Sequence, residues 1–238
     1  MVEKFWKLVW HPDSIPKVNT FIWLLLHNKL LTAENLRKRG ILGPSRCALC
    51  HSSEESSSHL FLQCEFSRLA WKLILPTAFN RELPGNAPQL LKEWASLFPG
   101  SLNKKPILRR IWAAIPKNLC WQLWLARNRV IFKEQKVIPV QIVAKTIGMI
   151  AEKFASNNIT FPQQESIPEP LANWCKLFLK EKSSLQSNYI SGSKSIPAQP
   201  LHWEVRLSST EFQSWLRAKN SYSLFFDGAS KCNPGVGS

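Results

Sequence analysis

The sequence predicts a mainly α-helical protein, and three observations support this fold class. Apolar residues recur at the three- and four-residue spacing of a helix through most of residues 16–154. Proline and glycine residues divide this pattern at places typical of helix ends. Four cysteine and histidine residues between the second and third periodic stretches have the spacing of a metal-binding loop. We therefore expect a helical metal-binding module, a helical middle region and a less regular C-terminal part.

Two helices are predicted before the cysteines. The first begins at Pro16, whose fixed φ suits the first turn of a helix, and its apolar residues keep helical spacing to Leu26. The second helix is short, with Thr32 as its N-cap and Gly40 as its stop. Both helices would pack beside the cysteine segment that follows them.

The cysteine segment has the pattern C-x2-C-x8-H-x4-C, formed by Cys47, Cys50, His59 and Cys64. A tight turn brings the sulfurs of Cys47 and Cys50 together, and His59 and Cys64 complete the four N/S ligands that structural zinc prefers. Because His59 and Cys64 lie five residues apart, they do not share one face of an unbroken helix. We expect the chain to bend between them, near residues 62–63, and to hold a structural Zn²⁺.

Other interpretations of these cysteines remain open from the residues alone. Buried free cysteines pack as small apolar residues, and C-x-x-C also occurs in redox proteins. The spacer between Cys50 and His59 is polar throughout, and no βαβ pattern surrounds the motif, so we favour zinc. His51 is the rival nitrogen ligand. It directly follows Cys50, where it would strain the turn, and we therefore prefer His59.

The spacing of apolar residues predicts further helices at residues 66–74, 90–98, 104–133 and 140–154. The apolar face of the helix after the cysteines would comprise Phe66, Leu69, Ala70, Leu73 and Ile74. We expect Pro116 to interrupt the long stretch at residues 104–133. The tryptophans of this region follow the apolar periodicity, so we expect them in the core and not as platforms for nucleic-acid bases.

The pattern weakens towards the C-terminus. Residues 156–221 have the composition of a linker that is largely disordered, with a short helix around residues 171–178. Residues 222–226 form a strand-like run, and a turn follows at residues 231–235.

The net charge of +15 is concentrated in the middle of the chain, where residues 76–155 carry 13 basic and 4 acidic groups. Such an excess suggests a surface for a polyanion, and RNA or DNA is the polyanion we favour. A basic surface that serves only solubility explains the charge equally well. The candidate phosphate contacts beside the cysteines are Arg37, Lys38, Arg39 and Arg46. Weaker candidates in the middle region are Arg109, Arg110, Arg127 and Arg129.

The compartment also follows from composition. No uncharged apolar run approaches the roughly 20 residues needed to span a bilayer, and the N-terminus lacks the shape of a signal peptide. The six cysteines form no regular disulfide framework. We therefore expect an intracellular protein, nuclear or cytoplasmic, with no membrane partner.

The four ligand candidates belong to a wider pattern across residues 5–75. It comprises Trp6, Pro16-Lys17-Val18, Phe21, Trp23, Leu30, Thr32, Leu36, Arg39-Gly40, Cys47, Cys50, Glu55, His59-Leu60-Phe61, Cys64 and Trp71. This pattern resembles the zinc-binding domain that follows reverse transcriptase in plant non-LTR (LINE-type) retrotransposons. The run Trp121-x2-Trp124…Arg127-Asn128…Ile131-Phe132 is similar to the helical region that usually comes next. The resemblance implies a structural Zn²⁺ on the cysteine and histidine set.

The C-terminal run FDGASKCNPG, residues 226–235, resembles the first strand and hairpin of a ribonuclease H domain, usually written DGA(S)-x-GNPG. The resemblance implies that Asp227 corresponds to the first metal-binding carboxylate of that family, which would hold Mg²⁺ only in an intact domain. Cys232 stands where the family has Gly, and a residue with a Cβ resists positive φ. No acidic residue follows Asp227 in this sequence, so we expect an incomplete catalytic site and no enzyme activity.

These observations predict four regions. They are a zinc-binding domain (1–75), a basic helical region (76–155), a linker (156–221) and a truncated ribonuclease H-like start with a β-hairpin of an α/β domain (222–238). We expect a retrotransposon-derived protein that binds nucleic acid without catalysis. The alternatives are a fragment of an RNA–DNA hybrid ribonuclease, and a protein-interaction scaffold or remnant that binds no nucleic acid.

Overall fold

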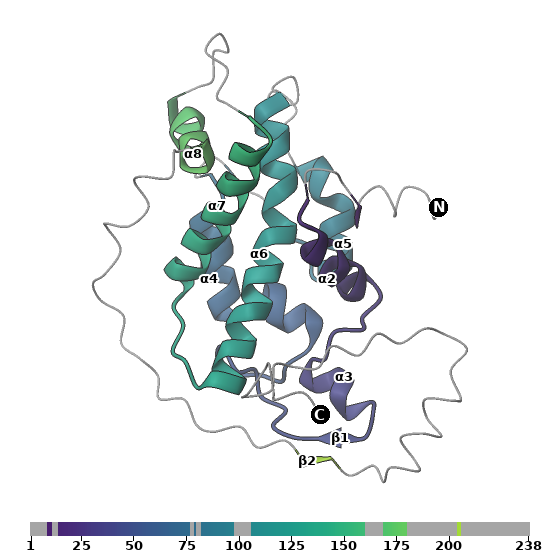
Figure 1. Cartoon of the computed structure of the whole chain (residues 1–238). Helices are drawn as coiled ribbons and strands as arrows, with labels where there is room; N and C mark the ends of the chain where they lie inside the picture. Colours follow the sequence, from purple (N-terminus) through teal and green to yellow (C-terminus); the bar gives the residue numbers. More distant parts are fainter. Residues whose placement is uncertain are drawn as a thin grey trace, which may run out of the picture.

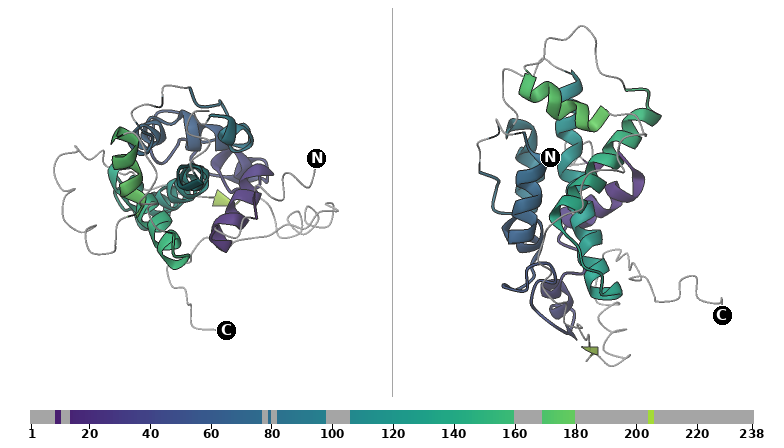
Figure 2. Two further views of the ribbon diagram at one scale, coloured as in Figure 1. Left: turned by 90° about the horizontal axis from the view of Figure 1, so that it is seen from above. Right: turned by 90° about the vertical axis from the view of Figure 1, so that its left-hand side faces the viewer.

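The computed structural model describes residues 9–10, 14–76, 79, 82–97, 106–159, 169–179 and 204–205. In this part of the chain, helices surround one long central helix, α6 (Pro106–Lys133) (Figure 1). Seen from above, α6 lies end-on in the middle of the assembly (Figure 2). The prediction of a mainly α fold is confirmed.

The first two predicted helices are present and begin where expected, and the second ends at Arg37, three residues before Gly40. Helix α2 (Pro16–Leu26) has its proline in the first turn. Helix α3 (Ala33–Arg37) begins after Thr32, whose Oγ1 accepts a backbone N–H of the first turn at 3.4 Å. Gly40 follows α3 with φ of 75°, a conformation that costs glycine little because it has no Cβ.

The two described strands are only two residues each. Strand β1 (Ile41–Leu42) pairs in an antiparallel register with β2 (Glu204–Val205), so that Ile41 lies opposite Val205. The sequence pattern did not predict either strand, because two residues are too few to show an alternation of apolar and polar positions.

Helix α4 (Glu65–Ile74) buries a different stripe from the one predicted. Leu69 and Leu73 are each 46% exposed. The buried residues are Ser67, Ala70, Trp71 and Ile74. The prediction was wrong for the two leucines because the Trp71 indole, which donates to the Phe61 carbonyl at 2.8 Å, turns the buried face of the helix towards itself. A sequence window cannot register such a specific hydrogen bond.

The predicted helix at residues 90–98 is present as α5 (Ala87–Glu93) followed by a 3₁₀ turn, η2 (Trp94–Leu97). The expected interruption at Pro116 is wrong, because α6 runs through this proline without a break. Proline removes one helical hydrogen bond, to the carbonyl four residues earlier. That carbonyl belongs to Trp112, and it accepts the indole N–H of Trp94 at 2.7 Å. The helix therefore continues because another element satisfies the freed acceptor.

The pairing of Trp94 and Trp112 is reciprocal. The Trp112 indole donates to the Trp94 carbonyl at 2.9 Å, and the two rings stack with centroids 4.4 Å apart. Trp112 is a core residue, as the periodicity predicted, and is 3% exposed.

Helices α7 (Pro139–Ser156) and α8 (Glu169–Leu179) complete the described fold. Helix α7 packs against α4, α6 and α8. Helix α8 is the short helix predicted within the linker, and its Trp174 indole donates to the Ile74 carbonyl at the end of α4, at 2.8 Å. One hydrophobic core thus joins helices from the predicted zinc-binding and basic regions.

Several predictions lie outside the described residues. They are most of the linker predicted at residues 156–221, the strand-like run at residues 222–226, and the hairpin with Asp227 and Cys232. In the described part of the chain, no helix is long and apolar enough to cross a membrane.

Candidate metal centre

The metal centre begins with a tight turn at Cys47–Cys50. The His51 N–H donates to the Cys47 carbonyl at 2.9 Å, and the Cys47 N–H donates to the Ser53 carbonyl at 2.8 Å. His51 has φ of 57°, which places its backbone in the left-handed region. The turn therefore directs the sulfurs of both cysteines to the same side, and His51 is not among the four clustered donors.

The second half of the site is a π-helical turn, η1 (His59–Gln63). The Cys64 N–H donates to the His59 carbonyl at 2.7 Å, which is the five-residue hydrogen bond of a π-helix. This wide turn places the side chains of His59 and Cys64, which are five residues apart, on the same side of the helix. The chain then leaves the helix at Cys64, with ψ of 131°, one residue after the predicted bend.

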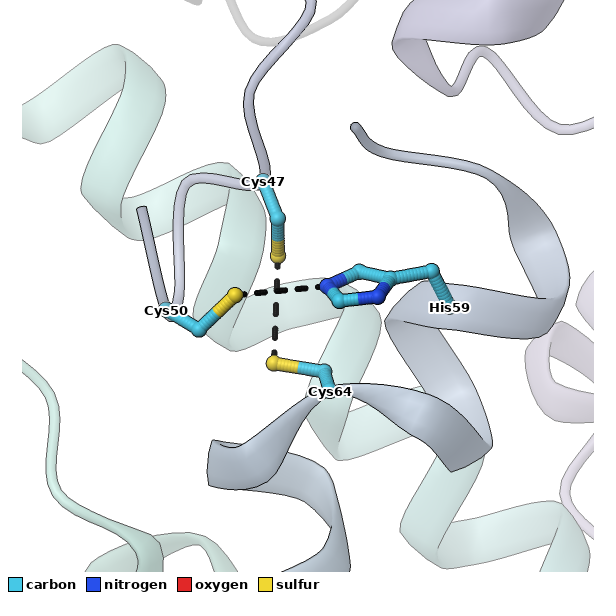
Figure 3. A group of neighbouring side chains, drawn as sticks. All are labelled: Cys47, Cys50, His59 and Cys64. Atoms are coloured by element: carbon cyan, nitrogen blue, oxygen red, sulfur yellow. Dashed lines mark hydrogen bonds between the residues drawn. The ribbon is translucent and has the colours of Figure 1, made fainter. Parts of the chain in front are cut away.

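The structure brings Cys47, Cys50, His59 and Cys64 together as predicted from their spacing (Figure 3). Their donor atoms all lie within 4.8 Å of one another. The sulfurs of Cys47 and Cys64 are 3.8 Å apart, and the Cys50 sulfur is 3.3 Å from His59 Nε2. The side chains point to a common centre from the turn, from η1 and from the start of α4.

These distances fit Zn²⁺. A tetrahedral centre with Zn–S of about 2.3 Å and Zn–N of about 2.0–2.1 Å separates two sulfurs by about 3.8 Å, and a sulfur from a nitrogen by about 3.5 Å. Both observed pairs lie close to these edges of the tetrahedron. Three thiolates and one imidazole also form the Cys₃His set that structural zinc uses.

The charges of the site also favour a cation. The hydrogen bond from Cys47, together with backbone N–H groups of Ser67 and Phe66 in the first turn of α4, lowers the pKa of the Cys64 thiol to about 5, against the opposing effect of burial. The same contact and burial raise the pKa of the Cys47 thiol far above its usual value. Without a cation only one of the two sulfurs ionises readily. A divalent cation holds both as thiolates.

One edge of the centre is nearer to solvent than the other. Cys47 and Cys64 are fully buried, whereas Cys50 is half-buried. The Ser52 hydroxyl donates to the Cys50 sulfur at 3.1 Å, a hydrogen bond that would stabilise a metal-bound thiolate at this position. Cys50 is therefore the ligand that solutes meet first.

The structure shows a further residue pair that sequence analysis did not place at the site. Residues 47–64, which carry the four donors, are called the metal loop. Arg127 on α6 and Glu55 in the metal loop form a buried ion pair, with Nη2 and Oε1 2.7 Å apart and both side chains 2% exposed or less. Arg127 Nε lies 3.0 Å from the other carboxylate oxygen, so the pair is bidentate. Glu55 Oε1 also accepts the Ala33 N–H, and Arg127 donates to the Leu31 carbonyl.

This pair corrects the prediction that Arg127 is a candidate phosphate contact. Its guanidinium is enclosed and matched by Glu55, so it is not available to a polyanion. No sequence signal links the two residues, since 72 positions separate them. The pair fixes the metal loop and the loop before α3 on the central helix.

The predicted phosphate contacts on α3 have partners within the protein. Arg37 lies 3.3 Å from Glu54, and Lys38 forms an ion pair with Glu34. All four of these groups are on the surface or near it, where such pairs contribute little to stability.

The other two predicted contacts differ in exposure. Arg39 is half-buried and donates to the Lys29 carbonyl at 3.4 Å, and burial lowers its pKa. Arg46 is exposed, and its backbone forms an isolated bridge with Glu54. Asp227, the carboxylate suggested by the ribonuclease H resemblance, lies outside the described residues.

Comparisons with known proteins agree with this geometry. Residues 1–71 match the family model described as zinc-binding in reverse transcriptase, and this segment contains all four donors. A protein of Arabidopsis thaliana with the provisional name ribonuclease H protein is 25% identical over 133 residues. The alignment covers 56% of this chain and 21% of that relative, so the chain spans about a fifth of its length. No solved structure matches the chain.

Proposed function

We propose that this chain is a retrotransposon-derived protein in which a structural Zn²⁺ organises a helical fold that binds the backbone of RNA or DNA. The convergence of four N/S donors within 4.8 Å, in the segment similar to zinc-binding domains of reverse transcriptases, carries the proposal. Four protein ligands fill a tetrahedral zinc, so no position is open for a substrate.

The zinc would hold three pieces of chain in one place: the Cys47–Cys50 turn, η1 and the N-terminus of α4. Structural zinc sites contribute about 10–16 kcal/mol of apparent binding free energy in small zinc peptides at neutral pH. We expect one equivalent of zinc in the purified, reduced chain. Metal analysis that finds no zinc in carefully prepared protein would contradict this part of the proposal.

The nucleic-acid part of the proposal rests on charge. The chain carries a net charge of +15, and Arg37, Lys38 and Arg46, which precede Cys47 in the sequence, are exposed. The surface pairs of Arg37 and Lys38 can be exchanged for phosphate at small cost, since exposed ion pairs are worth roughly 0–1 kcal/mol. The Arg46 side chain has no ion pair among the described residues, so it could bind phosphate without giving up an acidic partner. Binding of this kind depends on charge more than on base sequence.

The test is the salt dependence of binding to fluorescently labelled duplex DNA and RNA. Each phosphate that is neutralised adds about −0.9 to the slope of log affinity against log salt for B-DNA. Replacement of Arg37, Lys38, Arg39 and Arg46 by Gln should flatten this slope and leave the zinc content unchanged. Replacement of Lys17, Lys133, Lys136 and Lys176 by Gln, which removes four exposed charges elsewhere, is the matched control. A quadruple variant that binds with the parent slope would show that these residues are only a solvated face.

A nuclease function is the second candidate, supported by the name of the Arabidopsis relative and by the ribonuclease H resemblance at Asp227. Two-metal hydrolysis requires several carboxylates around ions about 3.5–4 Å apart, and the resemblance assigns one of them, Asp227, within residues 1–238. We therefore propose that the polypeptide of residues 1–238, taken by itself, does not cleave RNA. Incubation with an RNA–DNA hybrid and Mg²⁺ or Mn²⁺ tests this directly. Cleavage by the parent that is lost in Asp227→Asn would refute it.

A further inference from the structure

A groove of about 710 Å³ lies beside the metal centre, between α4 and the chain that leads from α4 to α5. Its volume is within the range of about 300–1,000 Å³ that is usual for ligand sites. The lining is mainly apolar, with Leu62, Leu75 and Leu83 among its residues. No residue of the predicted sites contributes to it.

The metal centre defines one wall of this groove. Leu62 and Gln63 line the groove and belong to η1, between the donors His59 and Cys64. The Gln63 amide donates to the Gly85 carbonyl at 3.2 Å, which links this wall to the opposite one. The shape of the groove therefore depends on the π-helical turn that the metal would hold.

An aromatic ring contributes to another wall. Phe79 lines the groove and is half-buried, and its ring packs against Trp112 of the central helix with centroids 5.3 Å apart. The contact with Trp112 holds the Phe79 ring in place. A ring supported in this way offers a platform for a planar group in the groove.

The rim of the groove is positively charged. Arg68 and Lys72 are one helical turn apart on α4, both are exposed, and both line the groove. Neither has an acidic partner among the residues that the structure describes. Glu82 is the one acidic residue among the described residues of the lining.

From this arrangement we propose that the groove binds single-stranded nucleic acid, with phosphates along Arg68 and Lys72 and one base against Phe79. The proposal rests on the nucleic-acid function proposed above and names a site for it. Cations beside an apolar, aromatic groove are the combination that single-strand binders use. A paired base in a duplex is stacked between its neighbours and cannot enter such a groove.

The test compares a labelled deoxythymidine decamer with a duplex of the same length. Arg68→Gln with Lys72→Gln removes two surface charges and should reduce the salt slope for the single strand by about 1.4, since each phosphate contact contributes about 0.7. Phe79→Leu keeps an apolar contact with Trp112 and should weaken single-strand binding about 5- to 150-fold. Lys133→Gln with Lys136→Gln is the matched control, and zinc content and melting temperature verify that each variant is folded.

The outcomes separate this proposal from the function on which it rests. If the parent binds the decamer and the Arg68/Lys72 variant keeps its affinity and slope, the groove is not the site, although the chain remains a nucleic-acid binder. An equal loss for decamer and duplex would also overturn the single-strand assignment. If the parent binds neither probe at low salt, the proposed nucleic-acid function itself fails. The Arg68/Lys72 variant decides whether the groove is the binding site even if Phe79→Leu does not fold.

Discussion

Glu55 and Arg127 join the metal loop to the central helix α6. Their ion pair is buried and bidentate, and Glu55 also accepts the Ala33 N–H. Burial makes each partner dependent on the other, because a lone charge in the interior has lost its water without any compensation. The pair therefore specifies how the loop sits on α6, whatever its net contribution to stability.

Arg127→Ala should destabilise the protein by about 3–5 kcal/mol, because it leaves the Glu55 carboxylate buried and unpaired. Urea denaturation measures this loss. A second test uses Glu55→Gln and Arg127→Met. The double variant should lose less free energy of unfolding than the sum of these two single variants, since neither charge remains alone. Strict additivity of the two losses would contradict the coupling.

Lys117 gives a prediction about pH. This lysine is 7% exposed, and its ammonium donates to the Val9 carbonyl at 3.3 Å. Burial lowers its pKa from 10.5 to about 8. Between pH 8 and 10.5 the unfolded chain therefore holds a proton that the folded chain has lost, and stability due to this group rises with pH. Below pH 8 both states are protonated, and the buried charge costs roughly 3 kcal/mol relative to the neutral form.

Replacement by methionine isolates this effect. Lys117→Met should be more stable than the parent at pH 7, and its advantage should shrink as the pH rises from 8 to 10.5. Chemical denaturation of both proteins across this range measures the difference. A constant difference over the whole range would show that the ammonium pays no penalty for burial.

At the scale of elements, the central helix shows how a local rule is overridden. Proline in a helix interior normally costs about 3 kcal/mol or more, yet α6 is continuous through Pro116. The carbonyl that Pro116 leaves free is engaged by the Trp94 indole of η2. A window of sequence cannot contain this partner, which lies 18 residues before Trp112.

Trp94→Phe keeps an aromatic ring against Trp112 but removes the donor to its carbonyl. The variant should lose about 1–3 kcal/mol, the cost of leaving a buried acceptor without a partner, in addition to a smaller packing loss. In a Pro116→Ala background the helix gains its own N–H donor to the same carbonyl, so the penalty of Trp94→Phe should fall. Thermal unfolding of the parent, Trp94→Phe, Pro116→Ala and the double variant measures the penalty of Trp94→Phe in both backgrounds. An unchanged penalty would refute the account given for Pro116.

The elements that the sequence predicted are those whose signal is local. Helix α3 has its cap at Thr32 and its stop at Gly40, and the metal loop follows from four residues within 18 positions. Predictions failed where a distant group decides the outcome, as for the continuity of α6 at Pro116 and for Arg127. The groove could not be predicted for the same reason, since its walls come from η1, α4 and the chain towards α5.

At the scale of the whole molecule, the predicted regions 1–75 and 76–155 share one core. Helix α2 packs on α6, and α4 packs on α7. Core residues such as Phe21 and Trp71 would lose much of their cover if the chain were cut after residue 75. Sequence boundaries between regions therefore do not imply that each region folds alone.

We expect the fragment of residues 1–75 to bind zinc but to lack the cooperative unfolding transition of the parent. Its exposed apolar surface should bind a hydrophobic dye, as partly ordered proteins do. Circular dichroism with and without zinc, beside the chain of residues 1–180, measures the difference. A fragment that melts with the sharpness of the longer chain would show that the zinc-binding segment is an independent domain.

The 72 positions between Glu55 and Arg127 also set an order of events during synthesis. Ribosomes add about 5–20 residues per second, so the carboxylate of Glu55 precedes its guanidinium partner by roughly 4–14 s. All four candidate ligands emerge well before α6, so the loop can bind its cation before Arg127 has been made. The nascent loop would thus be held by its metal and by the earlier contact with the Ala33 N–H, until α6 supplies the guanidinium.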